Sequence, residues 1–153
     1  MTIRLVEGNL DNPHVRDLLQ LHLDEMRQNS PPGSVFALDI EALKAPAVTF
    51  FTAWDGDELM GCGALKQLDT THGEVKSMRT HAAFQGKGVA ANVLSHIIGV
   101  CRDRGYTRLS LETGSADHFA TAQRLYQRFG FVSCVAFADY PENSFSRFYT
   151  LTL

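Results

Sequence analysis

A short glycine-rich loop constrains the fold most, because it joins two segments of different periodicity. The loop reads Gln85-Gly86-Lys87-Gly88-Val89-Ala90. Residues 74–80 before it are typical of a strand, and a helix is expected to begin near Gly88. Glycines let a ligand approach the backbone closely, and a helix N-terminus offers unpaired N–H groups to an anion. The loop therefore favours a phosphate cradle to which Lys87 adds a charge, with a plain connecting turn as the alternative.

The chain before the loop reads as a strand, two helices and three further strands. Residues 3–7 alternate as a first strand, and Asn12-Pro13 is a helix start from which apolar spacing continues to about Gln28. A short helix is expected near residues 39–44. Strands follow at 48–54, 59–68 and 74–80, with the glycine-containing turn 55–57 between the first two. Gly61 and Gly63 predict a bulge or a close backbone approach in the middle strand.

The chain after the loop alternates between helices and strands. The helix that starts near Gly88 ends at Gly105, and residues 107–113 form a strand. A second helix is expected at 118–129, followed by strands at 131–137 and 146–153. This order predicts one mixed α/β domain over residues 1–153, a length at which a single core suffices.

Charge and composition argue against several classes of partner. The net charge of −3 gives no general attraction to nucleic acid or membranes, and no apolar run approaches the ~20 residues of a membrane span. The N-terminus is too polar for a signal peptide. The three cysteines are predicted to be reduced, and the six histidines lack the spacing of a metal site. We therefore expect a cytoplasmic protein without a metal.

A dinucleotide-binding enzyme is the rival interpretation of the loop. Residues 86–91 also fit G-x-G-x-x-A, and Glu112 lies about twenty residues further on. However, residues 81–85 separate the motif from its strand, and a meander precedes it where a parallel fold would begin with it. Only about forty residues follow Glu112, too few for a second mononucleotide-binding half.

Two sequence blocks together resemble the GNAT superfamily of acyl-CoA-dependent N-acetyltransferases. Its signature [QR]-x-x-G-x-[GA] matches residues 85–90, and its late block A-x-x-L-Y-x-x-x-G-F matches residues 122–131. Residues 30–32 and 36–39 are similar to a subgroup of small bacterial members. The resemblance implies a central, mostly antiparallel sheet of about seven strands, with splayed fourth and fifth strands and about four flanking helices.

The resemblance also implies acetyl-CoA as the donor. Its pyrophosphate would bind the N–H groups of Gln85, Gly86, Lys87, Gly88, Val89 and Ala90. Its pantetheine arm would lie between the splayed strands, against Met78, Arg79 and Thr80. One departure is Phe119, which stands where many members carry an asparagine near the start of the late helix.

Acetyl transfer to an amine needs a base for the ammonium proton and an acid for the departing thiolate. Glu74 lies where some members carry a glutamate base, and an alternating strand would place it on one face with Met78 and Thr80. Tyr126 matches the family tyrosine that serves as general acid. The alternatives are a solvated strand-end glutamate and a packing tyrosine.

The acceptor is expected to be a primary amine of a small molecule or peptide. The resemblance places its wall at residues 22–39 and 138–147, with these candidates: His22, Glu25, Ser34, Tyr140 and Arg147. An acyl-CoA-binding regulatory module without turnover is a second class of function. The sequence leaves open the acceptor's identity and a homodimer.

Overall fold

The computed structural model describes residues 2–153, which build a seven-stranded sheet in the order β1-β2-β3-β4-β5-β7-β6. All neighbouring strands are antiparallel except β4 and β5. The strands are β1 (Arg4–Glu7), β2 (Val48–Asp55), β3 (Glu58–Gln67), β4 (His72–Thr80), β5 (Arg108–Gly114), β6 (Val132–Cys134) and β7 (Ser146–Thr152). The predicted mixed α/β fold is confirmed.

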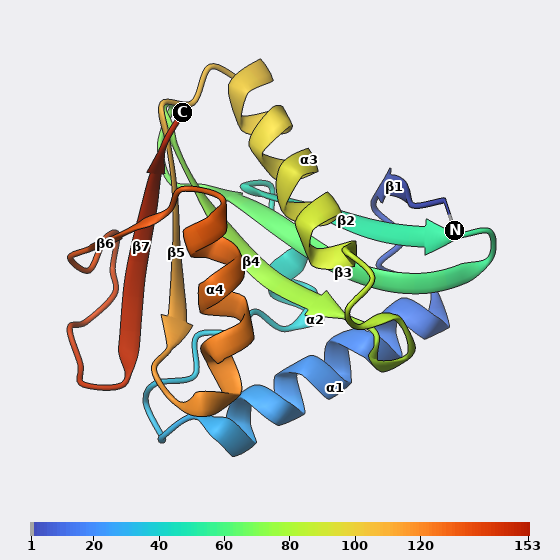
Figure 1. Ribbon diagram of the computed structural model, residues 1–153, viewed down its shortest axis with the longest axis horizontal. Coiled ribbons are helices and arrows are strands. Elements are labelled where there is room, and N and C mark those ends of the chain that lie inside the picture. Colours follow the sequence, from blue (N-terminus) through green and yellow to red (C-terminus); the bar gives the residue numbers. More distant parts are fainter. Residues whose placement is uncertain (1) are drawn as a thin grey trace.

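Four α-helices flank the sheet (Figure 1). They are α1 (Pro13–Asn29), α2 (Ile40–Leu43), α3 (Val89–Asp103) and α4 (Ala120–Arg128), with short 3-10 turns η1 (Ala82–Phe84) and η2 (Asp117–Phe119). Side-chain caps fix two of the helix starts. Asn12 Oδ1 accepts from the His14 N–H at 2.9 Å, and Asp39 Oδ1 accepts from the Ala42 N–H at 2.8 Å.

Two apolar clusters hold the helices against the sheet. On one face, Val93, Leu94 and Ile97 of α3 and Leu125 of α4 pack against residues of β2–β5 and β7. On the other face, Val15, Leu18 and Leu19 of α1 and Leu43 of α2 pack against residues of β2 and β3. The sheet thus has an α3/α4 face and an α1/α2 face.

The parallel strands β4 and β5 separate after three paired positions. Pairing runs from His72 with Arg108 to Glu74 with Ser110 and ends there, although β4 continues to Thr80 and β5 to Gly114. The splay predicted for the fourth and fifth strands is therefore present. It leaves the β5-facing edge of residues 75–80 free to pair with something other than β5.

A bulge in β4 reverses the direction of the side chains in its second half. Cys62 pairs with Arg79 and Ala64 pairs with Lys76, so Ser77 and Met78 together stand opposite Gly63. Ser77 has a φ of 55°, an uncommon conformation for a residue with a side chain. A Cβ at position 63 would lie 2.7 Å from Met78 Sδ, so the glycine is needed for this close approach.

The predicted element boundaries hold except near the C-terminus. The strand expected at 131–137 is only β6, and the helix expected at 118–129 begins as η2. Phe137 leaves the sheet edge because its ring packs against Tyr140, at 5.2 Å between centroids, and Phe148, at 5.8 Å. All three cysteines are free; Cys62 and Cys101 are buried, and Cys134 is half-buried.

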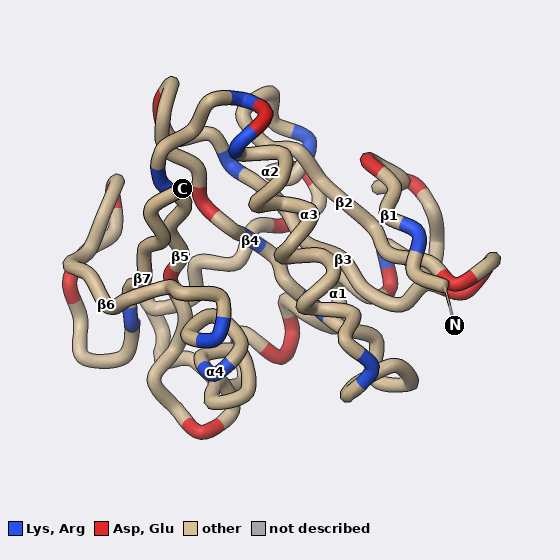
Figure 2. The backbone as a smooth tube through the Cα atoms, turned by 45° about the horizontal axis from the view of Figure 1, so that its top comes forward, with Lys and Arg blue, Asp and Glu red and all other residues tan. Residues whose placement is uncertain are grey.

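Charged residues of one sign do not gather on one element of the fold. Figure 2 shows lysines and arginines interspersed with aspartates and glutamates along the tube. Within residues 2–153, each helix is too short or too polar to cross a bilayer.

Candidate active site

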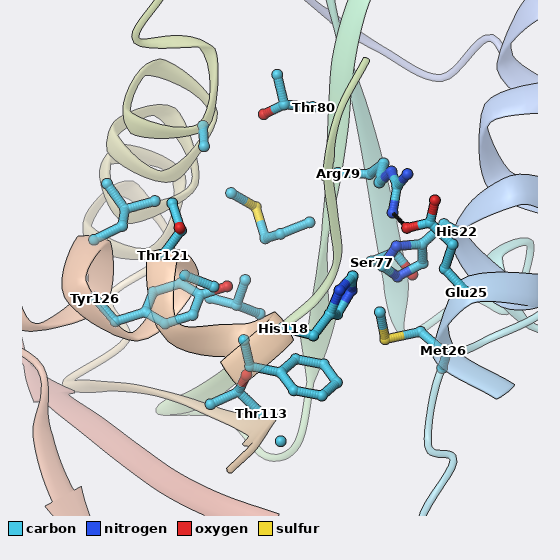
Figure 3. Close-up of a pocket in the computed structure, with 18 of the residues that line it drawn as sticks. His22, Glu25, Met26, Ser77, Arg79, Thr80, Thr113, His118, Thr121 and Tyr126 are labelled. Carbon is cyan, nitrogen blue, oxygen red and sulfur yellow. Dashed lines mark hydrogen bonds and ion pairs between the residues drawn. The ribbon is translucent and has the colours of Figure 1, made fainter. Parts of the chain in front are cut away.

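A cleft of about 750 Å³ lies where β4 and β5 separate. Its lining comes from the start of α3, from α4, from the free part of β4 and from α1 with the loop that follows it. Figure 3 shows this arrangement, with Tyr126 and Thr121 on the α4 side and His22, Glu25 and Met26 on the α1 side. The cleft therefore connects the two faces of the sheet through the splay.

The glycine loop forms one end of the cleft. Gln85, Gly86, Gly88, Val89 and Ala90 line it. Gly88 caps α3 with a φ of 80° and has only Asn92 Nδ2 near its missing Cβ, at 3.8 Å. Lys87 is exposed and is not part of the lining. The N-terminal N–H groups of α3 and their dipole thus face an open, ligand-sized space.

The free part of β4 presents alternate residues to the two faces of the sheet. Met78 packs against the apolar cluster that contains Val93, Leu94 and Ile97, called the α3 cluster below. Thr80 lies on the same side of the strand in Figure 3. Arg79 points the other way, to α1, where its Nη1 donates to Glu25 Oε2 at 2.5 Å. The backbone of all three residues borders the gap, but the Arg79 side chain belongs to the α1 side.

Tyr126 reaches the cleft from α4 although it is only 6% exposed. Its ring packs edge-on against Phe131, with centroids 5.8 Å apart. Burial and then the charge of Glu112 raise the pKa of Tyr126, so the phenol keeps its proton at neutral pH. A protonated hydroxyl here can donate a hydrogen bond but cannot act as a base.

Phe119 is buried at the start of α4 and lines the cleft. Its ring fills the space beside Gly114, where a Cβ would come within 2.3 Å of it, and packs edge-on against Phe145. The aromatic side chain therefore offers packing where a polar contact is usual in the resembled family.

Glu74 does not share a face with Met78 and Thr80, so that sequence expectation is wrong. The bulge at Ser77 shifts the alternation by one residue and leaves Glu74 on the α1/α2 face, 2% exposed. There Tyr140 donates a short hydrogen bond to its carboxylate, and Lys76 Nζ lies 3.5 Å away. Glu74 is outside the cleft lining.

Glu112 of β5 is a carboxylate that does line the cleft. Ser146 Oγ donates to it at 2.7 Å. Burial raises the pKa of Glu112, while the Ser146 hydrogen bond and the charge of Lys76 oppose that shift. The sequence signal for this residue was only a carboxylate near the end of a predicted central strand. The sequence patterns assign Glu112 a role only in the dinucleotide alternative.

Lys76 pairs with Glu74 in a buried network. Its Nζ donates to the Phe36 carbonyl at 3.0 Å and to the Tyr140 hydroxyl at 2.6 Å. Burial lowers the pKa of Lys76, against the charges of Glu74 and Glu112. Lys76 itself lines the cleft, so the network of Glu74, Lys76 and Tyr140 touches the site through this one cation.

The expected acceptor residues divide into two groups. His22, Glu25 and Ser34 line the cleft. Tyr140 lies outside the lining and donates its hydroxyl proton to Glu74. Arg147 is exposed, and its Nη1 donates to the backbone carbonyls of Ser144 and Ser146. Further lining residues were not singled out by the sequence: Ser77 at the β4 bulge, His118 of η2 and Thr121 of α4.

Within residues 2–153, no three His, Cys, Asp or Glu side chains gather as a metal site would require. The lining of the cleft offers carboxylate, phenol, imidazole and guanidinium groups.

The family model described as "Acetyltransferase (GNAT) family" matches residues 15–131. This chain belongs to that family, and the resemblance seen in its two sequence blocks is confirmed. It is 54% identical over 145 residues to the uncharacterized N-acetyltransferase YsnE of Bacillus subtilis, covering 95% of this chain and 96% of YsnE. It is also 32% identical over 120 residues to an IAA acetyltransferase of Azospirillum brasilense, covering 77% and 76% of the two chains.

Solved structures of similar fold include two with donor or product bound. A Bacillus subtilis acetyltransferase in complex with CoA has a TM-score of 0.74 and 21% identity, covering 99% of both chains. A GNAT acetyltransferase from Elizabethkingia anophelis with acetyl-CoA bound has a TM-score of 0.70 and 19% identity, covering 99% of this chain and 98% of the other. At these identities the likeness concerns the fold.

Proposed function

We propose that this protein transfers the acetyl group of acetyl-CoA to a primary amine of a small molecule or peptide. The observation that carries the proposal is the separation of β4 from β5 beside the N-terminus of α3. It provides an anion site, an unpaired strand edge and a cleft in one continuous space. Membership of the acetyltransferase family supports acetyl transfer as the reaction at this cleft.

The donor would be held by backbone groups at both ends. The N–H groups from Gly86 to Ala90 would receive the pyrophosphate. The free edge of β4 at Met78 and Thr80 would pair with the amides of the pantetheine arm, as a strand would. Lys87 is exposed beside the loop and would add a solvated charge near the phosphates.

The transfer forms one bond and breaks one. The neutral amine nitrogen attacks the thioester carbonyl carbon, a C–N bond forms, and the C–S bond breaks. The amine proton passes to a base, and the thiolate takes a proton from an acid. We assign the acid to Tyr126, which stays protonated, and the base to Glu112, because the other carboxylate of the cleft lining, Glu25, is paired with Arg79. Glu74 would reach the amine only through Lys76 or Tyr140.

The test is release of CoA, detected by its thiol, across a panel of amines with acetyl-CoA as donor. The Azospirillum brasilense relative is named an IAA acetyltransferase, so IAA belongs in the same panel. Turnover with an amine supports the proposal. Binding of acetyl-CoA without turnover on any acceptor would favour the regulatory module, and turnover with IAA alone would show a different acceptor chemistry.

Acetyl-CoA is expected to raise the melting temperature of the protein, and NAD is not. A ligand that binds only the folded state stabilises it by mass action, about 2.7 kcal/mol at a hundredfold excess over Kd. Differential scanning fluorimetry at matched ligand concentrations measures the shift. A shift with NAD and none with acetyl-CoA would contradict the assignment of the donor.

Replacing Gly88 with valine is expected to raise the KM for acetyl-CoA at least about tenfold, with a smaller effect on the KM for the amine. A side chain would enter the space that the pyrophosphate needs. Steady-state kinetics with each substrate varied in turn measures the two constants.

The control for this variant is Gly105→Val. Gly105 has a φ of 81°, like Gly88, and also has open space around its missing Cβ, but it lies past the opposite end of α3. Both substitutions therefore strain the backbone similarly. If Gly105→Val raises the KM for acetyl-CoA as much as Gly88→Val, the effect is one of strain and the cradle is not a binding site.

A further inference from the structure

Three buried polar atoms along the α1 side of the cleft have no hydrogen-bond partner within residues 2–153. They are His22 Nδ1, Ser77 Oγ and Arg79 Nε. All three residues line the cleft, and His22 and Ser77 are each only 8% exposed. A buried polar atom without a partner is costly, so such atoms are rare away from sites where a ligand completes them. Three of them in one wall of one cleft indicate a group that the protein is built to receive.

The chemistry of these atoms defines that group as a hydrogen-bond acceptor. The Nε–H of arginine can only donate, so an ammonium or amine proton cannot satisfy it. The serine hydroxyl and a neutral imidazole can each donate as well. Burial and the nearby charge of Arg79 lower the pKa of His22 to about 4, so the ring is neutral at pH 7. A group with two acceptor oxygens matches this set of donors.

The guanidinium of Arg79 adds charge to the set. Its Nη1 is held by Glu25, which fixes the plane of the group and leaves the Nε–H without an acceptor. Burial is the main cause of the lowered pKa of His22, and the charges of Arg79 and then His118 lower it further, against the charge of Glu25. Planar guanidinium groups bind carboxylates in two-pronged geometry, which a lone carbonyl cannot match.

We propose that the acceptor is an amine that also carries a carboxylate, an amino acid or the C-terminal residue of a short peptide, and that Arg79, Ser77 and His22 bind this carboxylate. The inference rests on the proposed acetyl transfer and specifies its substrate class. The bulge supports it, because it turns Ser77 and Arg79 to the α1 side while Met78 packs against α3. The carboxylate would thus be anchored on the opposite side of β4 from the donor, with its amine directed to the splay and Glu112.

The test compares the binding of amino acids with that of their decarboxylated counterparts, without relying on turnover. Isothermal titration calorimetry in the presence of CoA would use leucine, phenylalanine and lysine against isoamylamine, phenethylamine and cadaverine. A charge-assisted, two-pronged contact predicts that in at least one pair the acid binds about tenfold or more tightly. Equal or weaker binding of the acid in every pair, or no measurable binding of any acid, overturns the proposal.

Two variants locate the effect. Ser77→Gly removes the hydroxymethyl side chain and accepts the positive φ, and Arg79→Gln removes the charge. Each variant is expected to raise the Kd for the amino acid at least about threefold, because hydrogen bonds to its carboxylate are lost. The Kd for the matched amine should stay within about twofold. Arg16→Gln, an exposed arginine of α1, is the control that should change neither. If both site variants keep the full preference for the acid, the carboxylate binds elsewhere and the proposal is wrong.

Acetyl transfer itself is judged separately by CoA release with the same panel. Equal turnover of the amino acids and their decarboxylated amines would support the proposed function and overturn this inference. Tight binding of an acid that depends on Arg79 and Ser77, without CoA release, would retain the carboxylate site and overturn the assignment as an enzyme of amine acetylation.

Discussion

Replacing Tyr126 with phenylalanine is expected to lower kcat by about 10- to 10⁴-fold while the fold stays intact, the range expected for loss of a general acid. The variant keeps the ring and its edge-on contact with Phe131, and it removes only the hydroxyl that borders the cleft. Without that proton donor the thiolate leaves unprotonated, so the transition state loses stabilisation that the ground state never had. Steady-state kinetics with saturating acetyl-CoA measures the change.

The matched control is Tyr106→Phe. Tyr106 is also 6% exposed and packs in the α3 cluster, but it lies outside the cleft lining and its hydroxyl has no partner within the described chain. Removing this hydroxyl should leave kcat unchanged and the melting temperature equal or higher. Full turnover of Tyr126→Phe with a good acceptor would show that Tyr126 only packs.

Replacing Glu112 with glutamine is expected to lower kcat at neutral pH by about 10²–10⁴-fold and to flatten the acidic limb of the pH profile. Glu112 must be ionised to accept the amine proton, so the rate rises with pH through its pKa. Burial raises that pKa, which moves the limb from the ordinary carboxylate range toward neutrality. Glutamine can still accept the hydrogen bond from Ser146, so the local structure should hold. The pH dependence of kcat for both proteins measures the effect.

Glu74→Gln is the comparison that distinguishes the two carboxylates. It removes the charge that faces Lys76 in a buried pair, so a lower melting temperature is expected. The acidic limb should persist, because the carboxylate on the cleft is untouched. Loss of the limb in Glu74→Gln together with its survival in Glu112→Gln would return the base to Glu74, the residue to which the sequence resemblance pointed.

The fold was predictable because its signals are local. Asn12-Pro13 starts α1, Gly88 starts α3 and the turn at 55–57 joins β2 to β3, each through backbone chemistry that a short window of sequence contains. Tyr126 and the glycine loop apart from Lys87, which the two motif blocks singled out, line the cleft. The end of β6 was missed because Phe137 leaves the edge for aromatic contacts with residues further along the chain.

The proposed acceptor side was not predictable in the same way. A single extra residue in β4 decides which of its side chains face α1. Strict alternation placed Glu74 with Met78, and the bulge at Ser77 separates them. Gly63 signalled an irregularity in β3, but the extra residue lies on the partner strand, which carries no glycine there. The grouping of His22, Ser77 and Arg79 arises only when α1 packs across the strand, a contact between distant parts of the chain.

The reversal of direction within β4 has a consequence for how such an enzyme changes its preferences. Positions 77 and 79 face α1, whereas position 78 packs against the α3 cluster and Thr80 lies on that same side. In the proposed reaction, neighbouring residues of a single strand would therefore serve different substrates. Substitutions at the odd positions can therefore alter which acceptor is chosen without disturbing how the acyl donor is held, and the reverse. Selection for the acceptor and selection for the acyl donor can therefore act on this short strand independently. A library that randomises only alternate codons of the strand would vary one of the two specificities at a time.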